Sequence, residues 1–140
     1  MPENPAPSPS PAPETLLGFD FGVRRIGVAL GNTLTRTARP LEIIPAEPVK
    51  ARFARIQQLL EEWGPDRLVV GLALTLDGGE QPHTGRCRRF ADQLRGRFGL
   101  PVELQDERGS SLEAQAMQRR NEPDDALAAA IILQRYLDAL

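Results

Sequence analysis

Four carboxylates stand at positions that a stably folded chain has little reason to choose. Asp20 interrupts an apolar run, and Asp106 and Glu107 follow directly on another such run. Asp125 opens a stretch whose next residues are apolar. A buried carboxylate costs free energy unless it is paired, hydrogen-bonded or bound to a metal. We therefore treat these four side chains as candidate site residues.

Each carboxylate also has a purely structural explanation, and the four explanations differ in strength. The dipole of a helix favours an acidic residue near the helix start, which is sufficient for Asp125. Asp106 and Glu107 are also consistent with a solvated strand end. Asp20 is the hardest to explain structurally, because Asp is disfavoured within a strand. Gly18, on the same face of that strand, has no side chain to crowd a ligand there.

Three oxygen ligands drawn from different elements would suit Mg²⁺ or Mn²⁺ rather than zinc, since the chain has no cluster of His or Cys. A site that holds two such ions about 3.5–4 Å apart can hydrolyse phosphodiesters. One ion lowers the pKa of the attacking water, and the other stabilises the leaving oxygen. Arg24, Arg25 and Arg108 are expected to hold or neutralise the phosphates near this site.

The single histidine and the single cysteine fit this chemistry less well. His83 lies in a Gly- and Pro-rich stretch, where we expect a solvated side chain. Cys87 falls on the apolar face of a predicted helix, so we expect it to pack in the core. One cysteine also excludes an intramolecular disulfide and is typical of a reducing cytoplasm.

The elements that must position these residues follow from the period of the apolar residues. Leu17, Phe19 and Phe21 alternate with Leu16, Gly18 and Asp20, which predicts a strand with Asp20 on one face. The pattern predicts strands over 15–21, 25–30, 41–44, 67–71 and 101–105, and helices over 49–63, 86–98 and 124–140, with a Gly-rich loop over 76–85. Ser110 and Glu113 form a capping-box pattern that predicts another helix start. This order predicts an α/β domain with one mixed five-stranded sheet, its first three strands antiparallel, flanked by helices.

Length and composition are those of one ordinary domain. The chain has 140 residues, of which 41% are hydrophobic and 26% charged. Residues 1–13 contain six prolines and are expected to form a disordered tail, so we place the folded domain at 14–140. The longest apolar run, residues 126–133, is much shorter than the roughly 18 residues of a membrane span. We expect a cytoplasmic protein with no membrane partner.

Nearly all basic side chains are arginines, and many gather in one predicted helix. Lys50 is the only lysine among seventeen basic residues. Helix 86–98 carries five arginines opposed only by Asp92: Arg86, Arg88, Arg89, Arg95 and Arg97. A base composition rich in Arg codons would explain this bias, and such a run is often only a solvated helix face. If the run borders the site, Arg86, Arg88 and Arg89 would track a nucleic-acid backbone.

Four ordered motifs resemble the YqgF family, also called RuvX, whose members are RuvC-like. The motifs are LLGFDFGVRRIGVALGN, DRLVVGLALTLDG, FGLPVELQDERGSSLEA and DALAAAIILQRYLD, and together they span most of residues 15–140. The family usually has Pro at the position of Ala73 and Asn at that of Thr75. Because of the second difference, no role is assigned to Thr75.

The resemblance implies an RNase H-like fold and a divalent-metal-dependent nuclease. On the matching positions it implies that Asp20, Glu107 and Asp125 are both catalytic residues and ligands of Mg²⁺ or Mn²⁺ in a two-metal site. Members of the family are described as maturing the 5′ end of 16S rRNA or as resolving four-way DNA junctions. Structured RNA is therefore the first expected substrate.

The sequence leaves three other functions open. Resolution of a DNA junction uses the same metal site, but it needs two symmetric cuts and therefore a homodimer. The Asp-x-Gly pattern after a first strand also occurs in actin-like ATPases, which clamp a nucleotide between two domains; this chain has the length for one. A non-catalytic binding module is disfavoured because all three carboxylates are present.

Overall fold

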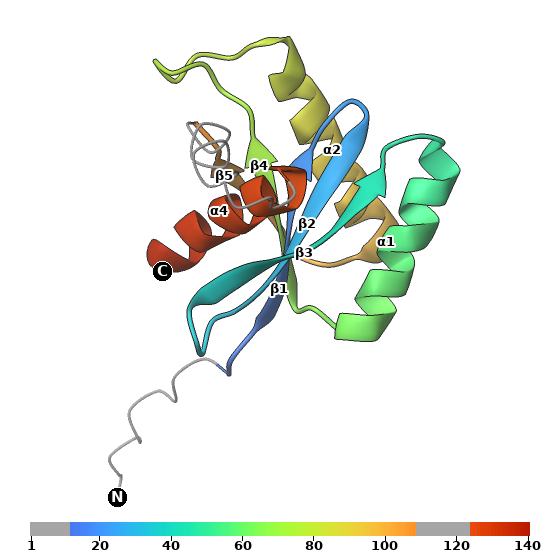
Figure 1. Ribbon diagram of the computed structural model, residues 1–140, viewed down its shortest axis with the longest axis vertical. Helices are drawn as coiled ribbons and strands as arrows, with labels where there is room; N and C mark the ends of the chain where they lie inside the picture. Colours follow the sequence, from blue (N-terminus) through green and yellow to red (C-terminus); the bar gives the residue numbers. More distant parts are fainter. Residues whose placement is uncertain (1–11, 109–123) are drawn as a thin grey trace, which may run out of the picture.

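The computed structural model describes residues 12–108 and 124–140 as five strands and three helices (Figure 1). The strands are β1 Thr15–Phe21, β2 Arg25–Asn32, β3 Thr37–Pro45, β4 Arg67–Leu72 and β5 Val102–Asp106. The helices are α1 Val49–Trp63, α2 Pro82–Phe98 and α4 Asp124–Asp138. The N-terminal tail, apart from residues 12 and 13, and the capping-box pattern at Ser110 and Glu113 lie outside the described residues.

The five strands form one mixed sheet in the order β3-β2-β1-β4-β5. β1, β2 and β3 pair antiparallel, whereas β4 pairs parallel with both β1 and β5. This arrangement confirms the predicted sheet. The carboxyl ends of β1, β4 and β5 consequently lie at one edge of the sheet, where side chains from all three can meet.

The alternation of β1 sends its residues to two different hydrophobic layers. Leu17 and Phe19 belong to the core that α1 and α2 cover, while Leu16 packs with α4 on the other face. Gly18 is also on the α4 face, because a Cβ there would come within 2.9 Å of the Leu133 Cβ. The expectation that Gly18 makes room for a ligand is therefore wrong: it makes room for helix α4. Figure 1 shows α4, in red, on the opposite side of the sheet from α1 and α2.

Helix α2 begins four residues earlier than predicted. Pro82 is the first helical residue, and Gln81 before it forms a reciprocal capping box with Thr84 in the first turn. Pro fits the first turn because its missing N–H has no intrahelical acceptor there. His83 is therefore a helical residue rather than part of the Gly-rich loop.

The other boundaries agree with the pattern to within a few residues. Strand β3 is longer than predicted, because Thr37–Pro40 also pairs with β2. Gly64 ends α1 in a left-handed conformation, φ +54°, which glycine adopts without strain. In the part of the chain that the structure describes, no helix is long and apolar enough to cross a membrane.

Candidate active site

Asp20 and Glu107 meet at the carboxyl edge of the sheet. Asp20 is near the end of β1 on the face covered by α4, and Glu107 follows β5 directly. Their carboxyl groups are within hydrogen-bonding contact of each other, and both side chains are half-buried. The structure therefore brings together two of the three predicted ligands from strands that are not neighbours.

A glycine in the intervening strand makes this contact feasible. Glu107 continues the pairing of β5, since its N–H donates to the Leu72 carbonyl at 3.2 Å. Its carboxylate lies over Gly71 in β4, where a Cβ would come within 2.9 Å of Oε2 and 2.6 Å of the Ile132 Cδ1. Without a side chain at Gly71, the Glu107 carboxylate can approach Asp20.

Asp125 approaches the same edge from the start of α4. Its backbone carbonyl lies against Gly27, which is the residue opposite Asp20 in the β1–β2 ladder. The Asp125 carboxylate is close enough to raise the pKa of Asp20 by charge repulsion. Its Oδ2 also accepts a 3.0 Å ion pair from the Arg25 Nε. The three predicted ligands therefore share one region, with Asp125 held by an arginine.

Burial and mutual repulsion disfavour full ionisation of the pair. Loss of solvation raises the pKa of Asp20, and the charge of Asp125 raises it further, while the hydrogen bond with Glu107 and the charge of His83 oppose this. Loss of solvation, together with the charge of Asp20, raises the pKa of Glu107 to about 8. Two such carboxylates share a proton near neutral pH, or bind a cation in its place.

This donor set fits a hard divalent cation. Carboxylate oxygens are the ligands that Mg²⁺ and Mn²⁺ prefer. Among residues 12–108 and 124–140, however, no three His, Cys, Asp or Glu side chains are grouped so that they could hold a metal ion. The Asp20–Glu107 pair is in place, and Asp125 would have to move from Arg25 to join it.

Asp106, the neighbouring carboxylate, has a different role. It accepts hydrogen bonds from the backbone N–H and the Nε of Arg108, at 2.8 and 2.6 Å, and these lower its pKa. Arg108 also donates to the Leu76 carbonyl in the loop after β4, and its own carbonyl accepts from Arg135. Asp106 thus holds Arg108 in place just after the end of β5, and it is not a member of the Asp20–Glu107 pair.

The other predicted phosphate-binding arginines are exposed. Arg24 and Arg25 lie at the tight turn between β1 and β2, which the Gly22 N–H closes by donating to the Arg25 carbonyl. Arg86, Arg88 and Arg89 are exposed along the first half of α2, and Arg88 forms an ion pair with Glu80 at 3.5 Å. Their exposure is compatible with nucleic-acid contact.

Two polar residues near the site behave differently from what the sequence indicates. His83 is half-buried rather than solvated, and its Nε2 donates to the Phe21 carbonyl at 2.6 Å. Its position in the first helical turn, after Gln-Pro, is the signal that could have revealed this. Thr75 organises the loop after β4. Its hydroxyl donates a hydrogen bond to the Asp77 carboxylate and accepts one from the Gly79 N–H. Cys87 is fully buried, as predicted.

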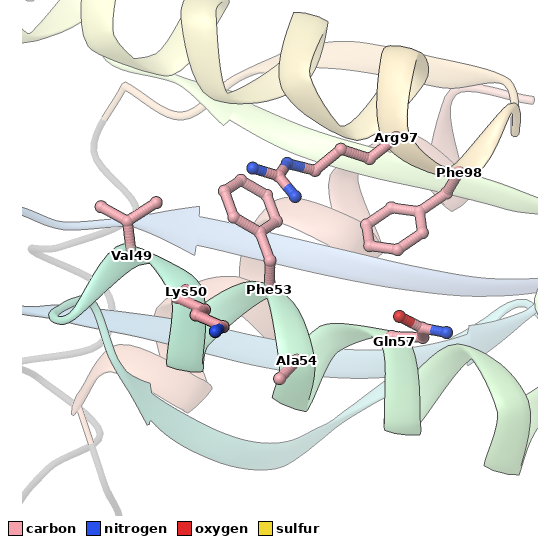
Figure 2. Close-up of a pocket in the computed structure, with 7 residues that line it drawn as sticks. All are labelled: Val49, Lys50, Phe53, Ala54, Gln57, Arg97 and Phe98. Atoms are coloured by element: carbon pink, nitrogen blue, oxygen red, sulfur yellow. The ribbon is translucent and has the colours of Figure 1, made fainter.

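A groove of about 480 Å³ lies away from these carboxylates, between α1 and α2 (Figure 2). Phe53 and Phe98 line it, and the Arg97 guanidinium lies 4.0 Å from the centre of the Phe53 ring. The groove contains none of the predicted site residues. The candidate site is therefore an open edge of the sheet rather than this hollow.

Two solved structures with a similar fold are Holliday junction resolvases. The RuvC of Thermus thermophilus in complex with a Holliday junction substrate has a TM-score of 0.59 and 20% identity, covering 90% of this chain and 94% of that chain. The fowlpox virus Holliday junction resolvase has a TM-score of 0.57 and 11% identity, covering 89% and 98%. The fold is thus the RNase H-like fold of this class of nucleases.

The family follows from comparison of the sequences. The family model RuvX, described as a Holliday junction resolvase, matches residues 14–139, and the chain belongs to this family. A Bordetella petrii protein named "Putative pre-16S rRNA nuclease" is 72% identical over 127 residues, which cover 91% of this chain and 97% of that protein. A Ralstonia nicotianae protein of the same name is 49% identical over 137 residues, which cover 98% of this chain and 95% of that protein. The resemblance drawn from the four motifs is confirmed.

Proposed function

We propose that this chain is a divalent-metal-dependent nuclease that processes the 5′ end of precursor 16S rRNA. The observation that carries the chemistry is the half-buried Asp20–Glu107 carboxylate pair with Asp125 in electrostatic range. The names of the Bordetella and Ralstonia relatives support precursor 16S rRNA as the substrate. Such a substrate would require the protein in the cytoplasm.

The residues have distinct roles in this proposal. Asp20, Glu107 and Asp125 would hold Mg²⁺ or Mn²⁺ at the carboxyl edge of the sheet. Bound divalent ions lower the pKa of an attacking water and stabilise the leaving oxygen. Asp20 and Glu107 are held together by the strands, so little reorganisation is needed there. Asp125 joins them when its ion pair with Arg25 opens.

The arginines supply the substrate contacts. Arg24 and Arg25 lie at the β1–β2 turn, where Arg25 pairs with Asp125, and Arg108 follows Glu107 in the chain. These three arginines would bind the phosphates next to the bond that is cut. Release of Asp125 frees the Arg25 guanidinium for a phosphate oxygen. Arg86, Arg88 and Arg89 would bind the backbone farther along, which is typical of sequence-independent recognition.

A second candidate substrate is the four-way DNA junction. The description of the matching family and the Holliday junction held in the Thermus RuvC complex favour it. The metal site would be the same, but two symmetric cuts require a homodimer. A chain that cuts as a monomer therefore argues against this alternative.

A cleavage assay with the purified full chain in Mn²⁺ tests the proposal. The substrates are a precursor 16S rRNA 5′ fragment, an unstructured RNA of equal length and a four-way DNA junction. We expect cleavage of the precursor, none in EDTA, and none with Asp20→Asn. Asp92→Asn, which removes an exposed carboxylate paired with Arg95 on α2, is the control and should retain activity.

The results separate the candidate functions. Preferential cleavage of the junction would replace the RNA substrate with DNA and leave the metal site intact. Cleavage that persists in EDTA or in Asp20→Asn would contradict the proposed chemistry itself.

A further inference from the structure

The end of β1 that carries Asp20 has a strand partner on only one side. On the β2 side, Asp20 pairs with Gly27 and Phe21 with Ile26. On the β4 side, the last pair is Phe19 with Val70. Asp20 and Phe21 therefore extend beyond the parallel ladder, in the direction where Asp20 meets the carboxyl group of Glu107.

His83 supplies the missing partner on this side. Its Nε2 donates to the Phe21 carbonyl at 2.6 Å, one residue beyond Asp20. Its ring also stacks on the Phe21 ring, with centroids 5.9 Å apart and planes 11° apart. The opposite ring nitrogen, Nδ1, is buried without a partner among the described residues. His83 therefore contacts both the backbone and the side chain of Phe21.

The helix turn that carries His83 is itself fixed to the sheet. The buried hydroxyl of Thr84 donates to the Ala73 carbonyl, directly after β4, and closes the capping box of α2. On the Phe21 ring, Phe90 stacks at 4.5 Å and the Arg52 guanidinium lies at 5.1 Å. We call His83, Phe90 and Arg52 the Phe21 clamp.

The clamp acts from the face of the sheet that the carboxylates do not occupy. Successive residues of a strand point to opposite faces, so Phe21 faces α1 and α2 whereas Asp20 faces α4. His83 stacks on Phe21, on the opposite face of the strand from Asp20, although its charge still lowers the pKa of the Asp20 carboxyl. The contacts of the His83 ring are with Phe21 rather than with the carboxylates, so they act on the position of Asp20 through the backbone of β1.

We propose that His83 is a positioning residue, which holds the end of β1 against β4 so that Asp20 stays beside Glu107. The inference rests on the proposed function, because its consequence is the affinity of the carboxylate pair for a divalent cation. When both carboxylates are ionised, their repulsion favours movement of this end of β1 away from β4. The hydrogen bond from His83 and the stacked rings oppose that movement.

Three variants of the full chain separate positioning from general stability. His83→Leu keeps an apolar contact with Phe21 but has no donor, whereas the amide of His83→Gln can place a nitrogen near the position of Nε2. Leu94→Val, in the core face of the same helix, lowers stability away from the clamp. For each we would measure the Mn²⁺ dissociation constant by calorimetry, the Tm, and hydrogen exchange of residues 19–22.

We expect His83→Leu to weaken Mn²⁺ binding about tenfold, in line with the loss of other residues that orient a ligand. His83→Gln should recover most of that affinity, and Leu94→Val should lower the Tm with an unchanged dissociation constant. Exchange of residues 19–22 should rise in His83→Leu alone. If His83→Leu does not fold, His83→Asn replaces it, because its shorter amide does not reach the Phe21 carbonyl.

The outcomes distinguish this inference from the function on which it rests. Wild-type affinity for Mn²⁺ in His83→Leu, with affinity lost in Asp20→Asn, overturns the role of His83 and leaves the proposed function standing. Failure of the wild-type chain to bind Mn²⁺ better than Asp20→Asn overturns the proposed function. In that case the hydrogen exchange of residues 19–22 still tests whether His83 holds the end of β1. Unchanged exchange in His83→Leu would overturn that role.

Discussion

The backbone carbonyl of Asp125 lies over Gly27, so close that a Cβ on Gly27 would come within 1.8 Å of the oxygen. Gly27 is also the partner of Asp20 in the β1–β2 ladder. The same glycine therefore brings the start of α4 into contact with the sheet and Asp125 into the region of Asp20.

Gly27→Ala should displace the start of α4. Overpacking of this kind costs about 1–3 kcal/mol, and more where backbone must move, so the Tm should fall and nuclease activity with it. Gly85→Ala is the matched control, because a Cβ there meets nothing within 4 Å and alanine is the better helix former. Thermal unfolding of both variants checks this, and an unchanged Tm in Gly27→Ala would show that α4 does not sit as described.

Asp20→Asn and Glu107→Gln should each lower the single-turnover rate constant of cleavage by about a thousandfold or more, and the double variant should lose little beyond the single ones. Groups that act as one unit show such non-additive losses. The measurement is single-turnover cleavage in Mn²⁺ by the two single variants and the double variant. Penalties that multiply in the double variant would mean that the two carboxylates do not share a centre.

The stability of the metal-free chain should fall as the pH rises from about 5 to 8. The pKa of Glu107 is raised from 4.5 to about 8, so the folded chain binds more protons than the unfolded chain in this window. The Tm should drop by roughly 5 °C or more over the interval, and Mn²⁺ should restore it. Thermal unfolding across this range, with EDTA and with Mn²⁺, measures the effect.

Glu107→Gln identifies the group responsible for that pH dependence. This variant should lose most of the slope and be more stable than the wild type at pH 8 without metal. Asp92→Asn, on the exposed face of α2, should keep the slope. An equal slope in wild type and Glu107→Gln would assign the pH dependence to other groups.

Replacement of Arg86, Arg88 and Arg89 by Gln should weaken binding of nucleic acid and make it less sensitive to salt. Each phosphate that the protein no longer neutralises lowers the slope of log K against log salt by about 0.7–0.9. The triple variant should therefore lower the slope by about 2–3. Arg55→Gln, on α1 in an ion pair with Glu42, should leave the slope unchanged. An unaltered slope in the triple variant would remove α2 from the binding surface.

The spacing of apolar residues along the sequence was sufficient to predict the five strands, their mixed pairing, and helices α1 and α4 to within a few residues. The start of α2 was missed because Gln81 is not among the usual N-cap residues, and its cap depends on Thr84 three residues later. That error also hid His83, since a residue in a predicted loop is assumed to be solvated. Its contact with Phe21 joins segments 62 residues apart, and local patterns do not encode such contacts.

The carboxylates show a similar division between local and tertiary information. Asp20 stands out in a strand, but the periodicity of β5 alone does not separate Asp106 from Glu107. The separation arises from Gly71 on β4, which admits Glu107, and from Arg108, which binds Asp106. The ion pair between Arg25 and Asp125 likewise depends on where α4 meets the β1–β2 turn, so the sequence indicated both residues without their contact.

Crystals of the full chain soaked in Mn²⁺ and measured at a wavelength where manganese scatters anomalously provide the most direct measurement. We predict a peak in contact with carboxylate oxygens of both Asp20 and Glu107, with Asp125 turned from Arg25 toward it, and no peak in Asp20→Asn. A map of the wild-type chain with manganese elsewhere, or none beside these two side chains, would contradict a metal centre at this edge of the sheet.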